Sequence, residues 1–266
     1  MRTTHWPMAA ILGLLLTGCA GAVTVPTPEA RHALAPTGKL RVGLYLGSSV
    51  QVIKDTASGE MKGVGFDLGK EFARRMGIPF EPVVYPSVGA LVDNARTGQW
   101  DIAFLAILSE RTKDVDFTAP ALEIELGYLV LGGSPISTLA AVDRPGVRVA
   151  VVEKGAVDVV LSRELKNATL VRGAGLAGGL EILKSAKADV IAASKANLLP
   201  ISDQLPGSRV LEGRFATERV AMALPKGRDL AIPYADKFVA VAKSEGLVKA
   251  AVQRAGLRGT ADARSQ

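Results

Sequence analysis

The sequence predicts an α/β protein of two lobes, each with a mainly parallel sheet and flanking helices. Short apolar strand segments alternate with amphipathic helical segments of about ten residues, which is the pattern of β-α-β units. This pattern runs through residues 40–107 and starts again at residue 147. The chain has 266 residues, of which 48% are hydrophobic and 22% charged, so it is long enough and apolar enough to form two cores.

The first lobe is expected to begin with strands and helices in alternation. Its apolar strand segments are residues 40–46, 80–85 and 101–107. Between the first two, apolar residues recur at every fourth position from a candidate N-cap at Asp67 to a stop at Gly77, which predicts a helix. A second helix is expected between Ser87 and Gly98.

The second lobe follows a long apolar connector at residues 124–131 and repeats the order. Its expected strands are residues 147–152, 169–172 and 189–193, and its expected helices are residues 156–165 and 176–186. In both halves a helix end and a small residue precede an aspartate, Asp101 or Asp189, that opens an apolar strand. A strand at residues 220–224 and a helical region at 229–255, broken near Pro233 and Gly246, complete the body.

The first residues are typical of an export signal. Arg2 precedes an apolar run at residues 8–16 that is too short to span a bilayer. The tetrapeptide that ends at Cys19 resembles a bacterial lipobox, which implies a signal peptide at residues 1–18 and a lipid on Cys19; the alternative is an ordinary cleaved signal with an incidental cysteine.

Two further segments are expected to lie outside the folded body. Residues 19–37 carry three prolines among small residues, and we expect the lipidated N-terminus and a tether there. Residues 259–266 are polar and are expected to form a disordered tail.

Histidine and cysteine are absent from the body of the chain. The two histidines are His5 and His32 and the one cysteine is Cys19. This excludes Ser-His and Cys-His nucleophiles, His-ligated metals and disulfides from the body, so we expect no cofactor and no metal site. The net charge of +6 suits capture of anionic solutes, whereas dispersed Lys and Arg and an aromatic content of 5% argue against nucleic-acid binding.

Four short segments carry a resemblance to a known family. They are KLRVG at residues 39–43, GVGFDL at 63–68, GQWDI at 98–102 and ERTKDVDFTAP at 110–120. In this order they resemble the signatures of the family 3 extracellular solute-binding proteins, the amino-acid-type binding components of ABC importers. The resemblance runs from about residue 38 to residue 256.

The resemblance implies the two-lobe periplasmic-binding-protein fold of type II. Two crossing strands would join the lobes, near residues 123–130 and 217–222. The implied domains are residues 38–126 for the first part of lobe 1, 127–218 for lobe 2 and 219–258 for the return to lobe 1.

Arg111 is the first candidate for ligand binding. The resemblance implies that it holds the ligand's carboxylate, and a planar, permanently charged guanidinium suits that role. The alternative is a solvated turn in which Arg111 pairs with Glu110 or Asp114. The hydroxyl that the family places three residues earlier is replaced here by Leu108, so Ser109 is expected to supply it.

The other candidate ligand contacts come from both lobes. They are Ser48 and Ser49 in a first pocket loop, Gly155 and Ala156 at a helix start, and Ser194 and Lys195 after the last strand of lobe 2. Each has a plain alternative, as a turn residue or as part of a solvated helix. The family's amino-acid binders carry an acid where Ser194 stands, so we expect a ligand other than an ordinary α-amino acid.

We therefore expect an exported, monomeric solute-binding lipoprotein rather than an enzyme. It would capture a small anionic or zwitterionic carboxylate, an amino acid or related organic acid, and deliver it to an ABC permease in the inner membrane. It would lie in the periplasm, touch the membrane only through its lipid and bind no nucleic acid. Two alternatives remain open: an exported dehydratase of the prephenate or arogenate type, with Glu153, Lys154 or Lys195 as proton donor, or a ligand-sensing module without transport.

Overall fold

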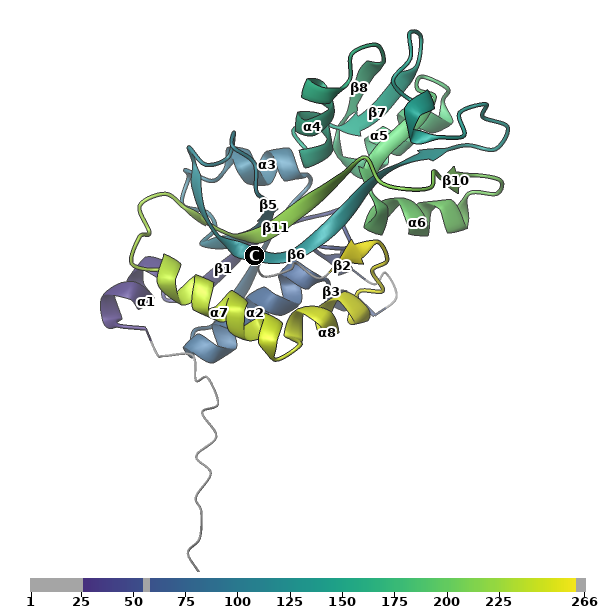
Figure 1. The fold of residues 1–266 in the computed structure, drawn as a ribbon. Coiled ribbons are helices and arrows are strands. Elements are labelled where there is room, and N and C mark those ends of the chain that lie inside the picture. Colours follow the sequence, from purple (N-terminus) through teal and green to yellow (C-terminus); the bar gives the residue numbers. More distant parts are fainter. Residues whose placement is uncertain (1–25, 55–57, 262–266) are drawn as a thin grey trace, which may run out of the picture.

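Two long strands join two α/β lobes in the computed structural model, which describes residues 26–54 and 58–261 (Figure 1). These strands are β6 (Val115–Val130) and β11 (Ala216–Pro225), and they pair antiparallel. Both lie in the middle of the sheet path β4-β1-β5-β11-β6-β9-β7-β8. The two expected crossing segments lie within them, and the predicted two-lobe fold is confirmed.

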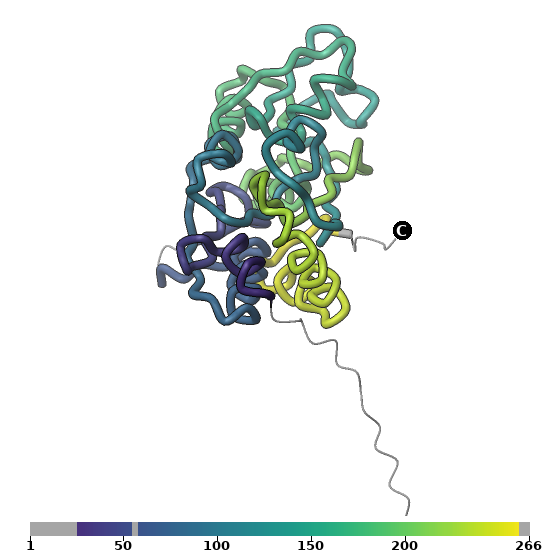
Figure 2. The backbone as a smooth tube through the Cα atoms, turned by 90° about the vertical axis from the view of Figure 1, so that its left-hand side faces the viewer, coloured from purple at the N-terminus to yellow at the C-terminus, as the bar shows by residue number. Residues whose placement is uncertain are grey.

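Lobe 1 contains the parallel strands β1 (Leu40–Tyr45), β4 (Phe80–Tyr85) and β5 (Ile102–Ala106). Its helices are α1 (Pro28–Leu34), α2 (Val64–Met76), α3 (Val88–Asp93), α7 (Ile232–Ser244) and α8 (Leu247–Arg254). The amphipathic α2 and α7 bury Phe72 and Phe238, whose ring centroids are 4.6 Å apart. The C-terminal helices thus close the core that the first part of the chain begins (Figure 2).

Lobe 2 contains the parallel strands β7 (Arg148–Val152), β8 (Thr169–Gly173) and β9 (Val190–Ser194). Its helices are α4 (Ala156–Glu164), α5 (Gly175–Lys184) and α6 (Lys195–Gln204), with a short 3₁₀ turn at Leu139–Ala141. β9 joins β6 antiparallel, and the short β10 (Arg209–Val210) also pairs with β6. Lobe 2 therefore has cores of its own, on both faces of this sheet.

The aspartates that open a strand in each half make the same contacts. Asp101 accepts hydrogen bonds from the backbone and guanidinium of Arg41 at 2.7 to 3.0 Å. Asp189 accepts the same set from Arg148 at 2.8 to 3.1 Å. The sequence echo between the halves thus reflects one Arg-Asp clamp that is built twice.

Three helix boundaries differ from the expectation. α2 begins at Val64 with Gly63 as its N-cap, so Asp67 lies in the first turn and is not the cap. Gly63 has a φ of 151°, and a Cβ there would lie 2.4 Å from the carbonyl oxygen of Gln51, so only glycine fits. α3 ends at Asp93, well before Gly98, and α7 begins near Pro233 rather than at residue 229.

The expected tether is partly helical. Thr27 caps α1 by accepting a hydrogen bond from the Ala30 N–H, and Leu34 is fully buried against lobe 1. Arg228 donates to the carbonyl oxygen of Ala33. Residues 28–34 are therefore part of lobe 1, because docking of their apolar face compensates for the ordering of the chain.

The expected tail begins later than predicted, because β12 (Thr260–Ala261) pairs with β6. The sequence also gave no sign of the hairpin of β2 (Ile53–Lys54) and β3 (Met61–Lys62). The signal peptide at residues 1–18 and the lipid site at Cys19 lie outside the described residues. None of the described helices is both long and apolar enough to cross a membrane.

Candidate functional site

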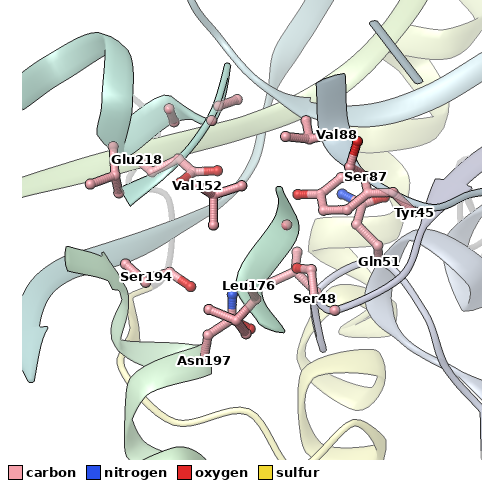
Figure 3. Close-up of a pocket in the computed structure, with 18 of the residues that line it drawn as sticks. Tyr45, Ser48, Gln51, Ser87, Val88, Val152, Leu176, Ser194, Asn197 and Glu218 are labelled. Carbon is pink, nitrogen blue, oxygen red and sulfur yellow. The ribbon is translucent and has the colours of Figure 1, made fainter. Parts of the chain in front are cut away.

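A pocket of about 80 Å³ lies between the lobes, beside the two crossing strands (Figure 3). The carboxyl ends of four strands reach it, through Tyr45 of β1, Ala106 of β5, Val152 of β7 and Ser194 of β9. Parallel sheets present their ligand sites at this end of their strands. The pocket is therefore the position at which this topology favours binding of a small molecule.

Arg111 lies in this pocket with only 5% of its surface exposed. Its Nη1 donates to the carbonyl oxygen of Ala106 at 3.0 Å, and its Nη2 donates across the cleft to that of Lys154 at 3.3 Å. Glu110 and Asp114 pair instead with Arg163 and Arg96. The solvated-turn alternative for Arg111 is therefore wrong.

Arg111 has hydrogen-bonding capacity to spare. A guanidinium has five N–H donors, and the contacts to Ala106 and Lys154 involve two of its nitrogens. Arg111 forms no ion pair with any residue that the structure describes. Burial lowers its pKa, and the nearby Tyr45 and Glu218 act in the opposite direction, so the group stays a cation that can accept an anionic partner.

Two ionisable side chains of the pocket were not among the predicted contacts. Burial raises the pKa of Tyr45 to about 12, so this phenol is neutral and can donate a hydrogen bond. Burial also raises the pKa of Glu218, while Arg111 lowers it. The sequence signal for Glu218 was the one acid of a crossing strand, between Thr217 and Arg219, and its inward direction could be read only from the pairing of β11 with β6.

The predicted lobe 1 serines have different positions. Ser48 is buried and lines the pocket. Ser49 does not line it, because its Oγ contacts lobe 2, at 3.4 Å from the carbonyl oxygen of Ala196 and 3.3 Å from Oδ1 of Asn197. Ser109 is also outside the pocket lining, because it lies on the exposed turn beside Glu110.

The predicted lobe 2 contacts divide in the same way. Gly155 and Ala156 line the pocket at the start of α4, where backbone N–H groups lack helical partners. Ser194 lines it at the end of β9 and is 9% exposed. Lys195 does not, because its Nζ donates to Oε2 of Glu125 on β6 at 2.7 Å.

Further lining residues come from loops and helix starts whose position depends on tertiary packing. Figure 3 shows Val152, Ser194 and Asn197 of lobe 2 facing Tyr45 and Ser48 of lobe 1. The other labelled lining residues are Gln51, Ser87, Val88, Leu176 and Glu218. Gln51 is nearly fully buried and donates to the carbonyl oxygen of Phe104, which holds the loop after β1 in place.

The candidate proton donors of the enzyme alternative lie elsewhere. Glu153 does not line the pocket, Nζ of Lys154 pairs with Asp93 at 2.7 Å, and Lys195 pairs with Glu125. Within residues 26–54 and 58–261, no group of three or more His, Cys, Asp or Glu side chains is arranged to hold a metal ion.

Sequence comparisons give one family and a distant curated relative. The model of the bacterial extracellular solute-binding proteins, family 3, matches residues 40–257. The ABC transporter glutamine-binding protein GlnH of Bacillus subtilis (strain 168) is 22% identical over 218 residues, which is 80% of this chain and 80% of that protein.

Solved structures show the same fold at low sequence identity. The solute receptor for L-cysteine of Neisseria gonorrhoeae has a TM-score of 0.75 and 22% identity, and the match covers 85% of this chain and 92% of that one. An amino acid ABC transporter substrate-binding protein of Streptococcus pneumoniae, bound to L-arginine, has a TM-score of 0.74 and 20% identity over 86% and 99%. The ancestral amino acid-binding protein AncCDT-1, a precursor of cyclohexadienyl dehydratase, has a TM-score of 0.72 and 21% identity over 84% and 97%. With its two crossing strands, its pocket between the lobes and the match over residues 40–257, the chain belongs to family 3 of the bacterial extracellular solute-binding proteins.

Proposed function

We propose that this protein is an exported receptor that captures a small carboxylate-bearing solute and delivers it to an ABC permease. The observation that carries the proposal is Arg111: a guanidinium almost fully buried in the pocket between the lobes, with donors to spare and no ion pair among the described residues. A carboxylate would pair with it in a bidentate way. Gly155 and Ala156, at the start of α4, line the same space, and the positive end of a helix favours the same charge.

Closure of the two lobes completes the proposed site. β6 and β11 are the only described strands that run through both lobes, so bending within them would open and close the cleft. In the closed form the lobes touch at the Arg111 contact to Lys154, at the Ser49 contact to Asn197 and at the Lys154 ion pair with Asp93. A ligand held by both lobes would strengthen this closed form, which a permease would then recognise.

A thermal-shift screen tests this function. The chain from residue 20 onward is mixed in turn with amino acids, keto acids, dicarboxylates and aromatic acids. A ligand at 100 times its Kd raises the free energy of unfolding by about 2.7 kcal/mol, which gives a clear shift of Tm. Arg111→Ala is expected to abolish the shift, whereas Arg96→Ala, which removes an exposed arginine outside this pocket, keeps it. An equal shift in Arg111→Ala would refute the site.

The dehydratase alternative needs a proton donor that acts on the ligand. Incubation of the purified chain with prephenate or arogenate, followed by ultraviolet detection of the aromatic product, is expected to show no turnover. Turnover at a rate that depends on Arg111 would replace transport by catalysis in this proposal.

The anchor at Cys19 is also part of the proposal. A lipid on Cys19 would hold the receptor at the periplasmic face of a membrane, with the segment up to α1 as the connection. The full chain expressed in a bacterium is expected to partition into the detergent phase, and Cys19→Ala is expected to remain in the aqueous phase. Equal partitioning of the two would refute the anchor.

A further inference from the structure

The pocket contains one cation and one carboxylate. Among the described residues that line it, Arg111 and Glu218 are the charged ones. They are close enough that each shifts the pKa of the other, yet they form no ion pair. A pocket with two separate and opposite charges differs from one built for a simple anion, which would present cations and N–H donors alone.

Glu218 lies on the crossing strand β11, opposite Ile124 of β6, where the two lobes meet. Its strand neighbours Thr217 and Arg219 are exposed, whereas Glu218 is half-buried and lines the pocket, as the alternation of a strand requires. Its carboxylate makes no hydrogen bond or ion pair in the described part of the chain. It therefore has no partner of its own among the residues that the structure describes.

Cations near the lobe junction are already engaged by other groups. Nζ of Lys195 and Nη1 of Arg214 both donate to the Glu125 carboxylate, at 2.7 and 2.8 Å. An unpartnered carboxylate inside a closed cleft costs free energy unless a cation or hydrogen-bond donors reach it. The ligand is the group that enters this space.

We infer that Glu218 pairs with a cationic group of the ligand, so that the site takes a small zwitterion, with its carboxylate on Arg111 and its ammonium on Glu218. This inference rests on the proposed function and specifies its ligand class. It also changes the expectation drawn from Ser194: lobe 2 offers no acid there, but the hinge strand supplies one from another direction. Ser194 and Asn197 then contribute neutral hydrogen bonds from lobe 2.

The position of Glu218 has a consequence for how the ligand is held. Both charged groups belong to lobe 1 or to the crossing strand, so the open form already presents a complementary pair to a zwitterion. Lobe 2 approaches afterwards with backbone N–H groups and neutral side chains. Selection between a zwitterion and an anion would thus occur before closure.

Matched ligand pairs test the inference. The wild-type chain is titrated calorimetrically with each proteinogenic L-amino acid and with the same acid lacking its amino group, such as phenylalanine against 3-phenylpropanoate and alanine against propanoate. Loss of one partner of a buried charge pair lowers affinity on the order of 30-fold or more, so the deaminated analogue of any amino acid that binds is expected to be weaker by at least this factor.

Two variants separate Glu218 from a general effect of charge. Glu218→Gln keeps the shape of the side chain. This variant is expected to bind the amino acid on the order of 30-fold more weakly than the wild type does. It is then expected to bind the amino acid no better than it binds the deaminated analogue. Glu123→Gln removes a carboxylate from β6 that does not line the pocket, and it is expected to keep the wild-type preference. If Glu218→Gln does not fold, Glu218→Asp and the wild-type ligand pairs decide.

The outcomes distinguish the inference from the function it rests on. Deaminated acids that bind the wild type as tightly as amino acids overturn the role of Glu218 and leave the receptor function intact. A Glu218→Gln variant that keeps the wild-type preference has the same meaning. If no carboxylate of either kind binds the wild type, both the receptor function and the inference are contradicted.

Discussion

The two lobes contain the same Arg-Asp clamp in two different environments. In lobe 1 the Asp101 side chain is 0% exposed, and a second arginine, Arg228, reaches it at 2.9 Å. In lobe 2 the Asp189 side chain is 35% exposed, and Arg148, at 43%, is its one ion-pair partner among the described residues. The same hydrogen-bond geometry is thus fully enclosed in one lobe and open to water in the other.

The returning C-terminal segment causes this difference. Arg228 follows β11, and its guanidinium also donates to the carbonyl oxygen of Ala33 in α1. Trp100, fully buried, precedes Asp101, whereas the small Ala188 precedes Asp189. The returning segment therefore gives the clamp of lobe 1 a second arginine, whereas the clamp of lobe 2 has no such addition in the described part of the chain.

Trp100→Ala is expected to have the largest effect on stability. The substitution gives lobe 1 the alanine that lobe 2 has at the equivalent position, Ala188. The indole is 0% exposed and its Nε1 donates to the Leu91 carbonyl oxygen at 3.1 Å. Removal of such a side chain costs about 3 to 5 kcal/mol of the free energy of unfolding. Urea denaturation measures this cost, and Trp100→Phe, which keeps much of the volume, serves as the graded control. A loss below about 1 kcal/mol would contradict this packing.

The paired substitutions Asp101→Asn and Asp189→Asn compare the clamps directly. Loss of the buried carboxylate leaves Arg41 and Arg228 without their partner and is expected to cost about 3 to 5 kcal/mol. The exposed clamp of lobe 2 is expected to cost about 1 kcal/mol or less. Equal losses in urea denaturation would show that enclosure does not set the value of the clamp.

Ser194→Ala tests how much lobe 2 contributes to binding. Its hydroxyl lines the pocket, and loss of one neutral hydrogen bond costs about 0.5 to 1.5 kcal/mol, or roughly 10-fold in affinity at most. Titration of the ligand found by the thermal-shift screen is the measurement. Complete loss of binding, as expected for Arg111→Ala, would place the main anchor in lobe 2 instead.

The smallest expected effect concerns acid stability. Hydrogen bonds and charge from Arg74 and Arg75 lower the pKa of Glu71 in lobe 1 to about 2, below the value of about 4.3 in an unfolded chain. A lowered folded-state pKa stabilises the fold above the unfolded pKa, and this contribution is lost as the pH falls from about 4.3 towards 2. Glu71→Gln is therefore expected to reduce the difference in Tm between pH 7 and pH 3, by an amount typical of a surface pair.

Asp143 gives the matching acid test in lobe 2. Backbone N–H groups of Ala168, Asn167 and Lys166 lower its pKa, so its contribution is also lost on acidification. Asp143→Asn is expected to change the same Tm difference in the same direction as Glu71→Gln. An unchanged difference in both variants would contradict the assigned hydrogen bonds.

Much of the fold could be predicted because local patterns and tertiary structure agree. Strand and helix segments alternate in both halves, and the Asp101 and Asp189 positions proved to hold the same clamp. α1 was missed because its order depends on burial of Leu34 against a segment that is distant in sequence. The start of α2 was displaced because Gly63 is required by the passing backbone of Gln51.

The candidate site could be predicted less completely. Arg111, Ser48 and Ser194 line the pocket, but Lys195 is drawn away by Glu125 on another strand, and this pairing has no local signal. Glu218 was missed because its local sequence suggests a side chain that faces solvent. A single acid in a strand looks solvated until the pairing with β6 shows which face of the strand meets the cleft.

The two proposed charge contacts are tested most directly by a calorimetric cycle with one amino acid, its amide and its deaminated acid. The three proteins are the wild type, Arg111→Gln and Glu218→Gln. The amide lacks the carboxylate charge, and the deaminated acid lacks the ammonium. We predict that the wild type binds the amino acid more tightly than either analogue. Arg111→Gln is expected to bind the amino acid and its amide equally, and Glu218→Gln is expected to bind the amino acid and the deaminated acid equally. If each variant keeps both preferences of the wild type, Arg111 and Glu218 do not hold the two charges of the ligand.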